Sequence, residues 1–113
     1  MIYHIVPRGE WQSQGDQMVY TPKSLGDEGF IHCSELKQLL GSASRYYKGR
    51  TDLLVLTVDP NRVIPTIVFE NAREGEEPFP HIYGPLNRNA VVGIHPLQAR
   101  PDGEFTLPET LAG

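Results

Sequence analysis

The chain has 113 residues, enough for one hydrophobic core and too few for two, so we expect a single domain over residues 1–113. Hydrophobic residues make up 39% of the chain, as in folded domains, whereas 11 glycines and 10 prolines are too many for a helical bundle. The formal net charge of −4 excludes a general basic field for nucleic acid or anionic membranes, so an RNA partner is disfavoured but stays open.

The first third of the chain predicts short strands separated by turns. Residues 2–6 are mostly β-branched or aromatic and end at Pro7, which has no amide proton for a ladder, so they predict a strand. Residues 8–14 predict a short helix, and residues 18–20 a brief extended segment. Residues 28–33 predict a longer strand that leads into the main helix.

Residues 34–47 predict the main helix of the domain. Ser34 is a suitable N-cap residue, because its hydroxyl can accept a hydrogen bond from the first turn. Apolar residues recur at helical spacing at Leu36, Leu39, Leu40, Ala43 and Tyr47. We therefore expect this stripe to be buried, and replacement of Leu40 by alanine to cost roughly 2–5 kcal/mol of stability.

The second half of the chain predicts more strands. Residues 53–58 are almost continuously apolar, as in a central strand covered on both faces. Residues 71–80 are rich in glutamate and proline and predict a solvated loop. Further strands are expected at residues 63–70, 89–94 and 104–107. The sum is an α+β domain of five to six short, mainly antiparallel strands and one main helix.

Several classes of site lack their sequence signals. The glycine spacing matches neither the Rossmann fingerprint nor the P-loop. Cys33 is the single cysteine, so no disulfide can form within the chain and no paired-cysteine zinc motif exists. No apolar run approaches the roughly 18 residues of a membrane span, and no signal peptide is evident, so we expect a cytoplasmic protein without a membrane partner.

Four histidines are the candidate chemical groups. His4 lies inside the first predicted strand, His32 at the junction of a strand and the main helix, and His81 in a segment rich in proline and glycine. His95 fits an exposed strand end. No ligand spacing typical of a metal site is present, so we expect no metal. A Cys33 nucleophile is a weaker alternative, because Cys33 and His32 would face opposite sides of a strand.

Several segments of the chain match a known family pattern. They are Ile2-Tyr3-His4, Glu10-Trp11, Glu28-Gly29-Phe30-Ile31-His32-Cys33-Ser34, Asp52-Leu53-Leu54-Val55-Leu56, Glu70, and Phe79-Pro80-His81-Ile82-Tyr83-Gly84-Pro85-Leu86. Through them the chain resembles the bacterial and plant family called domain of unknown function 952. The resemblance covers most of the chain, but this family has no assigned biochemistry.

The family is remotely similar to the ADP-ribosyltransferase-like fold, near the RNA 2′-phosphotransferases, and this resemblance implies a split sheet with NAD as the possible cofactor. It places His4 at the first-strand position, Ser34 or His32 at the second, and His81 at the third, with Glu70 as the alternative third residue. The implied catalytic residues are therefore His4, His32 and His81, and the implied ligand-binding residues are Ser34, Tyr46 and Tyr83.

Three interpretations follow from these residues. The first is a cleft lined by histidines that binds NAD, ADP-ribose or a related nucleotide and transfers a ribosyl or phosphoryl group. The second is a nucleotide-binding module without catalysis, and the third is a protein-interaction domain with structural histidines. The first two predict that the imidazoles of His4, His32 and His81 open into one shared pocket. The sequence does not indicate an oligomeric state.

Overall fold

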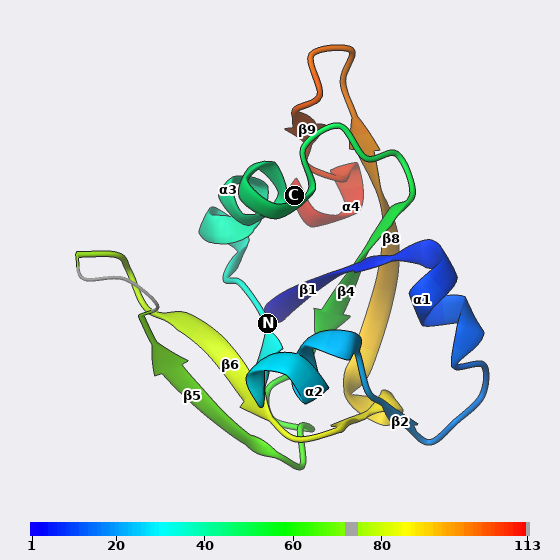
Figure 1. The fold of residues 1–113 in the computed structure, drawn as a ribbon, viewed down its shortest axis with the longest axis vertical. Coiled ribbons are helices and arrows are strands. Elements are labelled where there is room, and N and C mark those ends of the chain that lie inside the picture. The colour runs from blue at the N-terminus through cyan, green and yellow to red at the C-terminus, as the bar shows by residue number, and fades with distance from the viewer. Residues whose placement is uncertain (72–74, 113) are drawn as a thin grey trace.

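The computed structural model describes residues 1–71 and 75–112, which form an α+β fold with strands in three antiparallel sheets (Figure 1). The four-stranded sheet contains, in spatial order, β1 (Ile2–Pro7), β4 (Leu53–Val58), β8 (Val91–Ala99) and β9 (Phe105–Thr106). The three-stranded sheet contains β3 (Ile31–His32), β6 (Phe79–Tyr83) and β5 (Thr66–Glu70). A small third sheet pairs β2 (Val19–Tyr20) with β7 (Leu86–Asn87).

Helices cover both faces of the four-stranded sheet. They are α1 (Arg8–Ser13), α2 (Lys23–Glu28), α3 (Leu36–Tyr47) and α4 (Glu109–Ala112), with a 3₁₀ turn η1 (Arg88–Ala90). On one face Trp11 of α1 packs in an apolar cluster that Leu25 of α2 adjoins. On the other face Leu39 and Ala43 of α3 pack in a second cluster, which Leu111 of α4 adjoins. None of the helices in the described residues is long and apolar enough to span a bilayer.

The central strand β4 confirms the prediction from its apolar run. It pairs with β1 on one side and with β8 on the other, and all six of its residues are buried. Its side chains alternate between the two clusters, so Leu54 and Leu56 belong to one and Leu53 and Val55 to the other. A strand buried on both faces has no polar side, which explains the continuous apolar sequence.

The main helix lies where the sequence predicts it, but its cap and buried face differ. Its N-cap residue is Glu35, whose backbone N–H donates to the Gln38 side chain at 2.9 Å. Ser34 instead continues the extended backbone. The predicted buried face is also partly wrong, because Leu36 and Leu40 are 38% and 37% exposed. The helix is rotated so that Gln38 and Ser42 are buried in their place.

Short elements account for the other differences. Residues 23–28 form α2, although Gly26 and Asp27 predict a turn and Glu28 the start of a strand, and Gly29 ends this helix at a φ of +84°. The following strand is reduced to β3. The described residues contain nine strands instead of five or six. The strands without a prediction are β6, which begins within the predicted loop and continues into a segment rich in proline and glycine, and β7, which has two residues and gives little sequence signal.

The region after β4 also departs from the prediction. Pro65 precedes β5 and does not interrupt it. The predicted loop over residues 71–80 ends two residues early, since Phe79 and Pro80 already belong to β6; its residues 72–74 lie outside the described part. His95 lies within β8, where Thr57 and Thr110 contact its two ring nitrogens at 3.2 and 2.7 Å, so it is not at a strand end.

Candidate functional site

The two larger sheets meet at the free edge of β1. Tyr3 and Ser34 exchange two backbone hydrogen bonds of 2.8 Å, although 31 positions separate them in the sequence. The chain that leaves β3 is thereby fixed along β1 before α3 begins. This junction brings His4 of β1 next to His32 of β3, and it explains why Ser34 cannot serve as the helix cap.

His4 is held at the junction by both ring nitrogens. Its Nδ1–H donates to the His32 carbonyl at 2.7 Å, and its Nε2 accepts from the Tyr20 hydroxyl at 3.1 Å. The side chain is buried, and this loss of solvation lowers its pKa, so the ring is neutral at pH 7. His4 therefore acts as a bridge between β1, β2 and β3 within the protein.

A cavity of about 230 Å³ opens beside this junction, and we call it the central cavity. Strand β1, the end of β3, and helices α2 and α3 supply its walls. It is lined by Tyr3, His4, Ile5, Ser24, Glu28, His32, Ser34, Ser42, Tyr46 and Tyr47. Hydroxyls, imidazoles and aromatic rings thus converge on one space, as in sites for small polar ligands.

His32 is the histidine in this cavity with unused hydrogen-bonding capacity. Its imidazole makes no side-chain hydrogen bond to the described residues, and the rings of Tyr46, Phe79 and His81 lie 5.7, 5.1 and 5.3 Å from it. Burial, followed by the nearby His81, His4 and Arg45, lowers the His32 pKa to about 4. The ring is therefore neutral at pH 7 and offers one donor and one acceptor.

His81 belongs to a second cluster, on the neighbouring sheet. Its Nδ1–H donates to the Glu70 carboxylate at 2.8 Å, and the Tyr83 hydroxyl donates to the same oxygen. These two hydrogen bonds, that of Tyr83 first, lower the Glu70 pKa. The His81 ring stacks on Phe30 at 4.0 Å and is only 3% exposed. His81 therefore lies in a rigid strand, not in the turn that its proline and glycine neighbours suggested.

The structure divides the predicted site residues into two groups. His4, His32, Ser34 and Tyr46 line the central cavity. The expectation that three histidines open into one pocket is wrong for His81, because its ring faces Glu70 and Phe30 and reaches the central cavity only through contact with His32. The predicted Tyr83 stays with that second cluster. The catalytic and binding roles of these residues remain predictions.

Sequence reasoning missed several lining residues. Ser24 and Glu28 come from α2, a helix that the sequence did not predict because Gly26 and Asp27 within it are typical turn residues. Ser42 and Tyr47 come from α3, where the Ser42 hydroxyl shares a 2.8 Å hydrogen bond with Ser34. The polar positions 38, 42 and 46 recur at helical spacing, a signal that a search for apolar stripes alone passes over.

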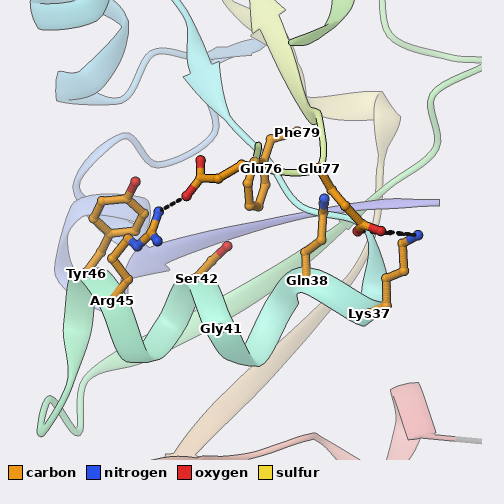
Figure 2. A pocket seen from close by; sticks show the side chains of 9 residues that line it. All are labelled: Lys37, Gln38, Gly41, Ser42, Arg45, Tyr46, Glu76, Glu77 and Phe79. Carbon is orange, nitrogen blue, oxygen red and sulfur yellow. Dashed lines mark hydrogen bonds and ion pairs between the residues drawn. The ribbon is translucent and has the colours of Figure 1, made fainter. Parts of the chain in front are cut away.

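Two further cavities adjoin the central one. The first, of about 250 Å³, lies between α3 and residues 76–79, and it shares Ser42 and Tyr46 with the central cavity; we call it the α3 cavity (Figure 2). The second, of about 180 Å³, lies against α2 and shares His4, Ser24 and Glu28 among other residues; we call it the α2 cavity. With these two cavities, the site has room for a ligand larger than a single ring system.

Cys33, the alternative nucleophile, lies in the core of the domain. Cys33 is 1% exposed within an apolar cluster, and this burial raises the pKa of its thiol, so it is a core residue in the protonated form. In the described part of the chain, no three His, Cys, Asp or Glu side chains converge as metal ligands would.

The fold and the site thus define an α+β domain with an imidazole-lined cavity where two sheets meet. A family model described as "Protein of unknown function (DUF952)" matches residues 5–94, and the chain belongs to this family. The crystal structure of CC0527 from Caulobacter crescentus is similar at 32% identity and a TM-score of 0.84, covering 99% of this chain and 98% of that one.

The solution structure of the same Caulobacter protein is similar at 29% identity and a TM-score of 0.77, covering 96% of this chain and 90% of that one. A search of curated proteins found no match. The names of these relatives give no ligand or activity, so the remote similarity to ADP-ribosyltransferases stays a prediction.

Proposed function

We propose that this domain binds a nucleotide of the NAD or ADP-ribose class in the central cavity. The lining supports this ligand class because hydroxyl and imidazole groups can hydrogen-bond ribose hydroxyls, and aromatic rings can stack on a base. The two adjoining cavities supply room for the remainder of an elongated ligand.

The observation that carries this proposal is the state of His32. A partly buried, neutral imidazole without a side-chain hydrogen bond to the described residues is a polar group placed for a ligand. The rings of Tyr46 and Phe79 lie beside it, at 68° and 38° to its plane. His4 fixes the position of His32, because its ring donates a hydrogen bond to the His32 backbone carbonyl.

Binding without turnover is better supported than transfer at the ribose. Transfer from NAD breaks the bond between nicotinamide and ribose, and a carboxylate or polar group has to stabilise the cationic sugar while water or another acceptor attacks. Here Glu70, a candidate for that role, accepts hydrogen bonds from His81 and Tyr83 and does not line the central cavity. His4, the first-strand candidate, already uses both nitrogens within the protein.

The test is isothermal titration of the purified domain with ADP-ribose and with NAD. The His32→Phe variant keeps a ring of similar size and removes the hydrogen bonds, so we expect at least a tenfold loss of affinity and a melting temperature within a few degrees of the parent. His95→Gln is the matched control, because His95 lines a separate cavity beside β8, β9 and α4 and none of the three cavities above, and it should bind the nucleotide as the parent does.

Two results would overturn the proposal: no binding of either nucleotide to the parent, or equal binding by His32→Phe. Release of free nicotinamide from NAD, measured in the same samples, separates a transferase or hydrolase from a binding module. We expect no release above the rate of NAD in buffer.

A further inference from the structure

The α3 cavity contains two cations that are already paired with carboxylates. Lys37 and Arg45 lie eight residues apart on α3 and so face the same side of the helix. Figure 2 shows both reaching across the cavity, where Lys37 meets Glu77 at 3.5 Å and Arg45 meets Glu76 at 2.8 Å. Two positive groups that line one cavity are a potential site for an anion.

The pair of Arg45 and Glu76 is incompletely satisfied. The Oε1 atom of Glu76 accepts from Arg45, whereas its Oε2 atom is buried without a hydrogen-bond partner among residues 1–71 and 75–112. A buried acceptor without a partner carries a desolvation cost, and an ion pair whose Arg45 side chain is 40% exposed contributes little in return. This carboxylate is therefore a replaceable partner for the guanidinium.

The charges that line the α3 cavity balance, with two cations and two carboxylates, whereas the α2 cavity on the opposite side of the site is net negative. The α2 cavity is lined by Glu10, Asp27 and Glu28 together with Lys23, so its carboxylates outnumber its ammonium group. An anionic part of a ligand would be repelled there and would be accepted beside α3. The difference in charge between the two cavities thus predicts the orientation of a bound ligand, with its anionic part in the α3 cavity.

We propose that the α3 cavity is the phosphate subsite of the nucleotide site, where the diphosphate of a ligand replaces the Glu76 carboxylate on Arg45, and where Lys37, held by Glu77 only through an exposed pair of 3.5 Å, is the second cation. This inference rests on the proposed nucleotide binding and adds its orientation. The shared lining residues Ser42 and Tyr46 connect the subsite to the central cavity. A phosphate can accept two parallel N–H···O hydrogen bonds from a guanidinium, whereas Glu76 accepts from Arg45 through one oxygen only.

The test compares three probes by titration calorimetry: ADP-ribose, adenosine and inorganic pyrophosphate. Glu76→Gln removes the resident charge, so ADP-ribose and pyrophosphate should bind three- to fivefold more tightly (roughly the value of one exposed ion pair), while adenosine should be unaffected. Arg45→Gln should weaken ADP-ribose about tenfold. Asp52→Asn is the matched control, because it removes the same charge from an Arg50 pair outside the three cavities.

The outcomes separate this inference from the proposed function. If ADP-ribose binds the parent, Glu76→Gln and Asp52→Asn equally, the phosphate subsite is overturned and nucleotide binding stands. If pyrophosphate alone binds and responds to Glu76→Gln, the anion subsite stands and the proposed function is overturned. If none of the three probes binds, both are overturned, and the melting temperature of each variant shows that the domain is folded.

Discussion

The two larger sheets of this domain use their buried space differently. In the four-stranded sheet, β4 is apolar apart from Thr57 and is covered by side chains on both faces. In the three-stranded sheet, β6 carries the buried His81, and β5 leaves Phe69 54% exposed. The three-stranded sheet also contributes Ile31 and Ile82 to the core, but the partly buried histidine–carboxylate pair lies there, and the histidines of the central cavity lie where the two sheets meet. The difference indicates that stability and ligand chemistry can be changed separately.

The largest expected effect comes from the centre of the first sheet. Replacement of the fully buried Leu56 by alanine removes apolar contacts and leaves a cavity, so we expect a loss of about 2–5 kcal/mol in the free energy of unfolding. Phe69→Ala in β5 should cost about 1 kcal/mol or less, since that ring is largely exposed. Urea denaturation of both variants measures the contrast, and equal losses would contradict it.

A smaller effect is expected at His81, where the choice of substitution separates its two nitrogens. His81→Gln loses the hydrogen bond from Nδ1 to the Glu70 carboxylate, so it should cost about 1–3 kcal/mol. His81→Asn places an amide N–H near the Nδ1 position, so it should cost less. Because this side chain is buried, both variants should also lower the melting temperature.

The same pair of variants tests whether His81 also has a functional role. If its Nε2 atom assists His32 in ligand binding, His81→Asn, which has no polar group at the Nε2 position, loses ADP-ribose affinity by about tenfold, whereas His81→Gln keeps an amide near that position and loses less. If His81→Asn binds ADP-ribose as the parent does, His81 is part of the architecture alone.

The two histidines at the junction of the sheets, His4 and His32, predict that the stability of the domain depends on pH. Burial lowers the pKa of His4, and it lowers that of His32 to about 4, while both groups titrate near 6.5 in the unfolded chain. Between pH 6.5 and 5 the unfolded state therefore binds protons that the folded state excludes, and stability falls with pH. Urea midpoints should be constant above pH 7 and decrease below 6.5.

His32→Phe removes one of these titrations and serves as the control. Its urea midpoint should fall less steeply between pH 6.5 and 5 than that of the parent. An identical slope would show that His32 does not contribute. The comparison is restricted to pH values above 5, because Glu70 has a lowered pKa and its contribution to stability is lost at more acidic pH.

The sequence predicted the elements whose signal is local. The apolar run of β4, the β-branched start of β1 and the position of α3 all follow from composition and periodicity along a few residues. The prediction also placed His4, His32 and Ser34 near one another, through the family resemblance and not through spacing. The structure brings all three to the lining of one cavity.

The remaining features depend on contacts between distant segments. The two-residue strands exist because a partner strand stabilises them, as when Ile31 and His32 pair with Ile82 and His81. The hydrogen bond of Glu70 with His81 arises from the pairing of β5 with β6, which no periodicity encodes. Nonlocal pairing of this kind overrides local propensity, so these features could be recognised only from the three-dimensional structure.

The smallest expected effect is that of Leu40→Ala in α3, a helix whose rotation the apolar stripe did not predict. Leu39 is fully buried in the apolar cluster that also contains Leu53 and Val55, whereas Leu40 is 37% exposed. Leu39→Ala should therefore cost about 2–5 kcal/mol, and Leu40→Ala about 1 kcal/mol or less, in place of the 2–5 kcal/mol that the stripe implied. The two substitutions delete the same atoms from adjacent positions of one helix, so helix propensity cancels in the comparison. Equal losses by urea denaturation would show that both leucines are core residues and that the polar lining of the α3 cavity, which depends on this rotation, is misplaced.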